Sequence, residues 1–163
     1  MNWFRKSKVT IEPVPDITTS ILYDETTFYN KFINDLSVTK EEVIIESPFI
    51  TTRRLNILKP IFERLIAKGV QVFVITRPPH EHDGDMAGQA EAGIRYFECI
   101  GVQVLLGAGG HHRKLAMIDR TVLWEGSLNI LSQSHSREFM RRIESRKLTE
   151  ELFSFLRFDR FIY

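Results

Sequence analysis

The sequence lacks the features that would place it outside a reducing compartment or within a membrane. Cys99 is the only cysteine among 163 residues, so an internal disulfide is excluded and a reducing compartment is expected. No apolar run approaches the roughly 20 residues of a membrane-spanning helix. No secretory signal peptide is expected at the start, because its basic residues precede no apolar stretch. These absences predict a cytoplasmic protein with no membrane partner, in which Cys99 is a buried residue on a helix.

An excess of one charge sign is also missing. The chain has 22 lysines and arginines against 21 aspartates and glutamates, which gives a formal net charge of +1. A histone-like or arm-type nucleic-acid binder would be far more basic. Any phosphate-rich partner must therefore be held by a local group of basic side chains, because the overall field is weak.

The apolar patterns predict one domain over residues 18–163, preceded by a linker-like flank at 1–17. Strand patterns are found near residues 18–23, 42–48, 70–76, 102–106, 114–118, 122–125 and 138–143. Helix patterns are found near residues 24–36, 53–68, 86–100 and 148–158. Strands alternate with helices in the first two thirds, and a hairpin signal follows at 119–121. The fold class expected is α/β, with a mixed, largely parallel central sheet flanked by helices.

One cluster of polar residues follows a fixed pattern, HxK-x4-D-x6-GSxN. Its members are His112, Lys114, Asp119, Gly126, Ser127 and Asn129. Residues two apart on a strand share a face, so His112 and Lys114 are expected to point together, as are Ser127 and Asn129. A hairpin would bring the two pairs side by side. An imidazole, an ammonium, a hydroxyl and an amide in one pocket suit a phosphoryl group.

This pattern resembles the signature of the phospholipase D superfamily, and the likeness extends over about residues 23–158. The resemblance implies a phospholipase D-like half-unit and a phosphodiesterase that needs neither metal nor cofactor and reacts through a phosphohistidine. It implies that His112 is the nucleophile or the acid, and that Lys114 and Asn129 bind phosphate. Ser127 would be a supporting hydrogen-bonding group. Glu138 resembles the acidic residue that single-motif members place after GSxN to orient the histidine ring, although a solvated strand charge is the alternative.

Three further residues complete the expected site. Asp119 falls at the turn with the opposite strand parity from His112, so its expected role is orientation or turn capping rather than contact with phosphate. Gly126 would permit close approach of the backbone. Arg77 follows a buried strand directly, at the edge where α/β sheets form sites, and is a candidate for contact with substrate phosphate.

The family chemistry uses two histidines on one phosphate, and the sequence contains no second HxK. The resemblance therefore implies a symmetric homodimer with the site at its interface. The short single-motif chain favours a nuclease, with DNA preferred to RNA, over a phospholipase or other small phosphodiesterase. A lipid enzyme would need an exposed apolar rim, and the loops offer no obvious one. A non-catalytic nucleic-acid-binding or dimerisation module, beside a helicase or other domain of a larger protein, stays open.

A second polar cluster lies in the segment His80-Glu81-His82-Asp83-Gly84-Asp85. Imidazoles and carboxylates suit zinc or manganese. The segment follows two prolines, however, and polar loops of this kind are usually solvated. No metal site is therefore expected there. His111 adjoins the main pattern but is out of register with Lys114, so it is expected to be a bystander.

Overall fold

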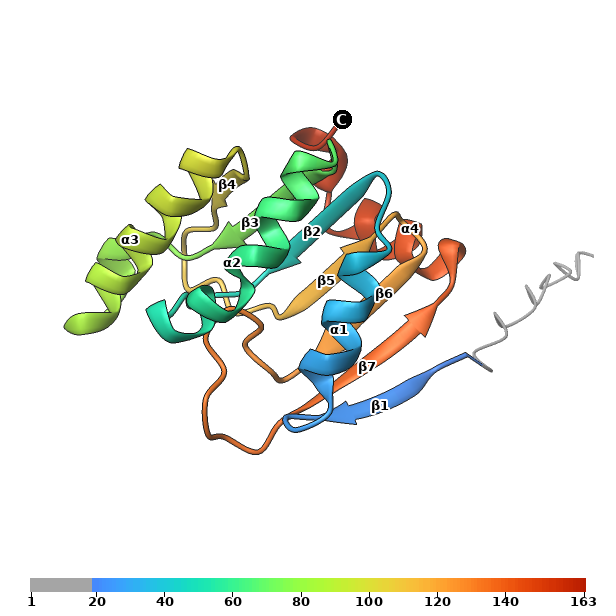
Figure 1. The fold of residues 1–163 in the computed structure, drawn as a ribbon, viewed down its shortest axis with the longest axis horizontal. Helices are drawn as coiled ribbons and strands as arrows, with labels where there is room; N and C mark the ends of the chain where they lie inside the picture. The colour runs from blue at the N-terminus through green and yellow to red at the C-terminus, as the bar shows by residue number, and fades with distance from the viewer. Residues whose placement is uncertain (1–18) are drawn as a thin grey trace, which may run out of the picture.

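The computed structural model describes residues 19–163, so the flank expected at 1–17 lies outside the described residues. The described part forms a seven-stranded sheet in the order β1-β7-β6-β5-β2-β3-β4 (Figure 1). Its strands are β1 (Ile21–Asp24), β2 (Glu42–Glu46), β3 (Gln71–Thr76), β4 (Gln103–Leu106), β5 (Leu115–Ile118), β6 (Val122–Gly126) and β7 (Phe139–Glu144). Its helices are α1 (Phe28–Ser37), α2 (Thr52–Ala67), α3 (Asp85–Ile100) and α4 (Arg146–Phe155), with short 3-10 turns η1 (Pro79–Glu81) and η2 (Phe158–Arg160). The expected elements are all found, each within a few residues of its predicted bounds.

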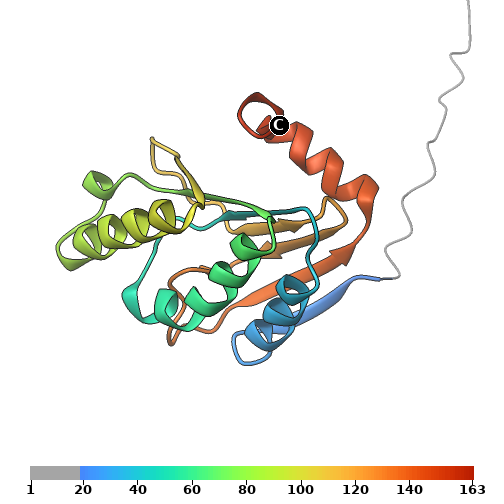
Figure 2. The same cartoon turned by 45° about the horizontal axis from the view of Figure 1, so that its top comes forward.

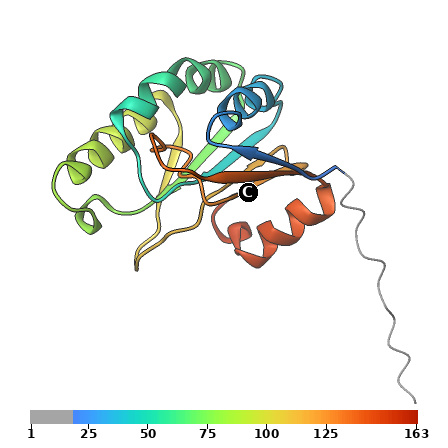
Figure 3. The same cartoon turned by 90° about the horizontal axis from the view of Figure 1, so that it is seen from below.

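The helices cover the two faces of the sheet unequally. Figure 2 and Figure 3 show α1, α2 and α3 on one face and α4 alone on the other. Side chains of β5 alternate between the two cores, with Ala116 and Ile118 under the three helices and Leu115 and Met117 on the α4 side. This burial on both faces explains why the central strands read as continuous apolar runs.

The mixed α/β class is confirmed, but the sheet is less parallel than expected. Only β2, β3 and β4 pair in parallel, through the crossover helices α2 and α3. The other four pairings are antiparallel, because β5, β6 and β7 follow one another through connections without a crossover helix. β5 lies beside β2, and so joins the antiparallel half of the sheet to the parallel half.

The hairpin between β5 and β6 turns at two residues with left-handed backbone. Asp119 has φ of 48° and Arg120 has φ of 52°, and the N–H of Thr121 donates to the carbonyl of Ile118 at 3.0 Å. Two consecutive positive φ angles characterise the tight turn whose twist matches that of paired strands. The expected hairpin is therefore confirmed.

Cys99 lies on α3, as expected, but it is exposed rather than buried. The buried face of α3 is formed by Ala90, Gly93 and Phe97. Two residues correspond to about 200° around a helix, so Cys99 faces away from Phe97 and the core. Among residues 19–163, no helix is both long and apolar enough to cross a membrane.

Candidate active site

The His112 and Lys114 side chains meet just before β5. The Lys114 ammonium lies 2.8 Å from His112 Nδ1 and donates to the carbonyl of the same residue at 2.9 Å. An ammonium can only donate hydrogen bonds, so Nδ1 accepts and the ring proton lies on Nε2. Burial lowers the pKa of Lys114, and the nearby Glu138 carboxylate acts in the opposite direction. The imidazole and the ammonium therefore lie side by side, as their shared strand parity predicted.

The segment from Ser127 to Glu138 brings three further expected residues to this edge of the sheet. Ser127 Oγ accepts from the backbone N–H of Phe139 at 3.2 Å, which fixes the hydroxyl beside β7. The buried Asn129 Oδ1 has no hydrogen-bond partner within the described chain. Glu138 accepts from the hydroxyl of Ser136 at 2.8 Å. The Asn129 oxygen thus has no partner in the described chain, while Ser127 supports the fold of its own segment.

Three side chains from other elements hold this segment in place. Tyr29 on α1 donates to the carbonyl of Ile130 at 2.8 Å. Ser47, directly after β2, accepts from the N–H of Leu131 at 3.1 Å. Arg54 on α2 donates to the carbonyl of Gln133 at 2.7 Å and lies over the Tyr29 ring. The loop that carries Asn129 is therefore anchored to three elements.

Gly126, at the end of β6, allows the backbones of β6 and β7 to approach closely. A methyl group at this position would lie 2.3 Å from the carbonyl oxygen of Phe139 and 2.9 Å from Met140 Cα. Both are backbone atoms, so a side chain could be accommodated only by moving β7. Gly126 thus sets the strand spacing beneath Ser127, and no contact with a ligand is needed to explain it.

We expect Gly126→Ala to lower the free energy of unfolding by about 1–3 kcal/mol, the usual range for overpacking a close contact. Urea unfolding followed by circular dichroism would measure the change. Gly88→Ala is the matched control, because a methyl group on Gly88 in α3 would meet no atom within 4 Å. That change should stabilise the helix by about 0.5–1 kcal/mol. Equal unfolding midpoints for the two variants would contradict the strand-spacing role.

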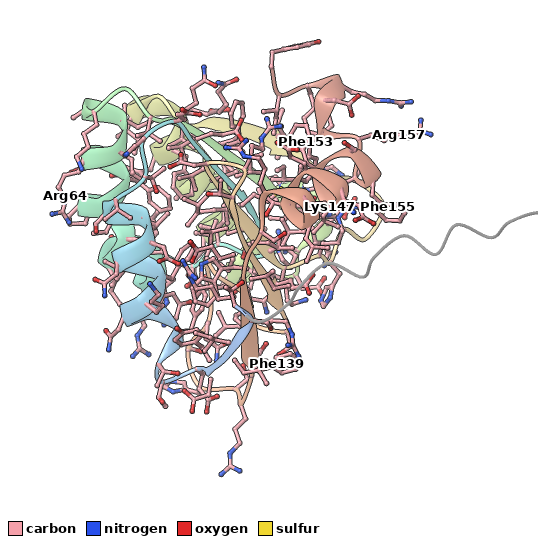
Figure 4. The ribbon with its side chains drawn as sticks, turned by 90° about the vertical axis from the view of Figure 1, so that its right-hand side faces the viewer. Arg64, Phe139, Lys147, Phe153, Phe155 and Arg157 are labelled. Atoms are coloured by element: carbon pink, nitrogen blue, oxygen red, sulfur yellow. The ribbon has the colours of Figure 1, made fainter. Side chains whose placement is uncertain are left out.

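A groove of about 660 Å³ opens between His112 and α4. Its polar lining includes the His112–Lys114 pair and Ser127, and its apolar lining includes Phe139 and Phe155. Phe139 is 53% exposed and Phe155 is 79% exposed, on the side of the molecule that faces the viewer in Figure 4. The site therefore has the exposed apolar rim that the loops did not predict, because the rim comes from β7 and α4.

Comparison with known proteins identifies the family of this chain. The family model described as "Cardiolipin synthase, PLD-like domain" matches residues 32–157, most of the chain and all of the HxK-x4-D-x6-GSxN pattern. The chain belongs to the phospholipase D-like family. The superfamily resemblance is thereby confirmed. No curated protein matched the sequence.

Solved structures of the phospholipase D family share the fold. Nuc from Salmonella typhimurium superposes with a TM-score of 0.68 at 15% identity, over 83% of this chain and 89% of Nuc. NucT from Helicobacter pylori gives 0.66 at 20% identity, over 83% and 91%. Phosphatidylserine synthase from Haemophilus influenzae gives 0.64 at 16% identity, over 83% of this chain and 37% of that protein. The chain therefore has the phospholipase D-type phosphodiesterase fold.

Asp119, the third named residue of the family pattern, lies at the opposite end of β5 from Lys114. Five residues of strand separate them by about 16 Å. The Asp119 carboxylate accepts from the backbone N–H groups of Lys40, Glu41 and Glu42 at 2.9–3.0 Å. Asp119 thus fastens the hairpin turn to the start of β2, and it lies away from the groove.

Arg77 is placed near the groove but is already paired. Its guanidinium donates to the backbone carbonyl of Glu81 at 2.7 Å and to the Glu81 carboxylate at 3.3 Å. It also lies 5.6 Å from the centre of the Phe49 ring, whose edge-on neighbour is His112 at 6.1 Å. The Phe49 ring therefore lies between Arg77 and His112.

Sequence reasoning missed an ion pair beside His112 and Lys114 that joins a buried carboxylate to a half-exposed arginine. Glu46, at the end of β2, is fully buried, and both of its oxygens accept from the Arg113 guanidinium at 2.7–2.8 Å. His111 lies 3.9 Å from the same carboxylate, and burial lowers the pKa of its ring. Arg113 stands between His112 and Lys114, so the pair fixes the backbone on which both are carried. The only sequence signal was an acidic residue at the end of an apolar run.

The segment His80–Asp85 does not gather as a metal site. In the part of the chain that the structure describes, no group of three or more histidine, cysteine or carboxylate side chains could hold a metal ion. Glu81 turns instead toward Arg77 and the glycine loop after β4. His82 packs on Phe49, with ring centroids 5.2 Å apart.

Proposed function

We propose that this chain is a metal-independent phosphodiesterase that hydrolyses nucleic-acid phosphodiester bonds, DNA in preference to RNA, at a dimer interface. The observation that carries the proposal is the contact between Lys114 and Nδ1 of His112 in the wall of an open groove. A cation beside a neutral imidazole can hold non-bridging phosphate oxygens while the ring attacks phosphorus. The similarity in fold to Nuc and NucT agrees with this proposal. Because one fold can serve several substrates, the choice of nucleic acid rests on the site and is tested below.

The reaction needs two histidines and proceeds in two steps. When phosphate enters, Lys114 turns from Nδ1 to the phosphate oxygens, and in this proposal Glu138 takes over the orientation of the ring. A ring nitrogen of one His112 then forms a bond to phosphorus as the bond to the leaving oxygen breaks. The His112 of a second copy enters the step as an imidazolium, gives that oxygen a proton and becomes neutral. It later takes a proton from the water that hydrolyses the phosphohistidine, which restores both rings.

Cleavage in the absence of metal tests this function. We expect the purified protein to cut labelled single- or double-stranded oligonucleotides in excess EDTA. Cleavage that requires added manganese would overturn the mechanism. Oligonucleotide binding without turnover in any buffer would instead favour a nucleic-acid-binding module of a larger repair or defence protein.

The second copy is expected to cover the apolar rim formed by Phe139 and Phe155. Each chain supplies one HxK pair, so the partner must approach the edge that carries His112. Phe139 and Phe155 lie beside that edge and expose large apolar rings, which is unusual on the surface of a monomer. The exposed apolar rim and the need for a second histidine therefore both favour a dimer interface on this face.

We expect Phe155→Asp to convert the dimer into a monomer at micromolar concentration, as measured by sedimentation velocity. Activity should fall by about 10²-fold or more, because the monomer lacks the proton donor. Ile57→Asp is the matched control, since Ile57 is 50% exposed on α2, which covers the other face of the sheet. A monomeric wild type with full activity, or a dimer that survives Phe155→Asp, would contradict this interface.

A phospholipid phosphodiesterase is the second candidate, because the same apolar rim could hold acyl chains. Two comparisons support this candidate: the family model described as "Cardiolipin synthase, PLD-like domain" and the similarity in fold to phosphatidylserine synthase. Vesicles of phosphatidylglycerol, offered in EDTA beside the oligonucleotides, separate the two. Release of the lipid headgroup with intact oligonucleotides would select the lipid activity.

A further inference from the structure

Two backbone N–H groups beside the site bind an internal carboxylate. Gly109 and Gly110 follow β4 and have φ of 79° and 75°. Their N–H groups donate to the two oxygens of Glu81, at 2.9 and 3.2 Å. Successive N–H groups on backbone of this kind form a concavity that binds anions. The donors hold the pKa of Glu81 below its usual value, so this side chain is an anion.

Arg77 supplies a third donor to the same carboxylate. Its Nε lies 3.3 Å from the Glu81 oxygen that Gly110 also contacts, and both side chains are about four-fifths covered. A planar guanidinium with two backbone N–H groups is a set of donors that suits phosphate as well as carboxylate. The three donors thus form a compact anion site that the chain itself fills.

The anion site lies next to the reacting pair. Gly110 is two residues before His112, and two residues of chain reach at most about 7 Å. The Phe49 ring bridges the remaining side, because it contacts both Arg77 and His112. His82 packs on the same ring, and its two buried nitrogens have no partner in the described chain. An imidazole with unused hydrogen-bonding groups is a further polar neighbour for a ligand at this position.

We propose that Glu81 occupies the place of a substrate phosphate, and that Gly109, Gly110 and Arg77 form a subsite for a phosphate flanking the scissile one in a nucleic-acid strand. This inference rests on the proposed function. The strand displaces the Glu81 carboxylate, which swings out to solvent, and its phosphate takes over the three donors. Glu81 therefore competes with the substrate and weakens binding of the strand.

Removing the competitor is expected to strengthen binding. In the His112→Ala background and in EDTA, fluorescence anisotropy with a labelled oligothymidylate should show Glu81→Ala binding about 3–10-fold more tightly, since a bound anion on three donors no longer has to leave. Glu81→Gln should show a smaller gain, and adding Arg77→Ala should cancel the gain. Glu91→Ala is the matched control, because it removes the same charge from the exposed surface of α3. Unchanged or weaker binding by Glu81→Ala would overturn the subsite and make Glu81 a structural fastener of the glycine loop.

Amide NMR signals locate the bound phosphate. In Glu81→Ala, the Gly109 and Gly110 signals should shift with the oligothymidylate and stay in place with the same strand carrying neutral methylphosphonate linkages. Inorganic phosphate that shifts them as strongly at equal concentration would assign the site to free phosphate and overturn the strand subsite. Failure of the proposed function looks different. In that case wild type would leave the oligonucleotide intact in EDTA, whatever Glu81→Ala does to binding.

Discussion

Phosphodiester cleavage is expected to fall by about 10⁴-fold or more when His112 is replaced by alanine, because both the nucleophile and the proton donor are lost. The measurement is the initial rate of oligonucleotide cleavage in EDTA, with circular dichroism to show that the fold persists. His112 is exposed just before β5, so its removal leaves the core intact. His135→Ala is the matched control, since His135 is an exposed histidine in the loop that follows the site. Equal activity of wild type and His112→Ala would sink the mechanism.

Mixing subunits extends this test to the shared site. If each active site takes one His112 from each copy, a dimer with one altered subunit is inactive. A half-and-half mixture that exchanges freely should then retain about a quarter of the activity of the same total amount of wild type. Retention of half would mean that each chain works alone.

A loss of about 3–5 kcal/mol in the free energy of unfolding is expected for Asp35→Ala, the range found when one partner of a buried ion pair is removed. Asp35 is 5% exposed at the end of α1. Its carboxylate accepts from Trp124 Nε1 at 3.1 Å and from Arg142 Nε at 2.7 Å. The change would leave the Trp124 indole N–H without its partner beneath the three-helix face, and the Arg142 guanidinium with only the exposed Glu144 carboxylate.

Urea unfolding and thermal melting measure the effect of this change. The melting temperature should drop by about 10 °C for a chain of this size. Asp35→Asn should lose less, because an amide oxygen can still accept from Trp124. Asp83→Ala serves as the control, since Asp83 is exposed before α3. A loss below about 1 kcal/mol would mean that water replaces the carboxylate, and would contradict the role given to Asp35.

The order of helices and strands could be predicted from the sequence because local chemistry determines it. Apolar runs bounded by proline and glycine predict the buried strands, and Asp119-Arg120-Thr121 predicts the hairpin. The position of β5 beside β2 has no local signal, since it depends on which strand edge remains free after β2, β3 and β4 have paired. The expectation of a largely parallel sheet failed for that reason.

The candidate site was predictable to the extent that it lies on one continuous pattern. His112 and Lys114 meet because alternation along an extended chain puts them on one side, even though β5 begins after them. The Glu46–Arg113 pair joins segments far apart in the chain, so no spacing reveals it. Glu81 was grouped with its histidine neighbours as a possible metal ligand, whereas its partners are Arg77 and the glycine loop that follows β4. The apolar rim was missed because Phe155 belongs to an amphipathic helix, where an apolar residue is expected to be buried. Its exposure can be seen only in the structure.

The arrangement of strands also has a consequence for how the protein is made on the ribosome. β2, β3 and β4 are consecutive along the chain and can pair while synthesis continues. β1 emerges before them, yet its only partner is β7, more than a hundred residues later. His112, Lys114 and Glu138 arrive with the same late strands. A nascent chain therefore cannot bring the candidate site together until the last strand has been made.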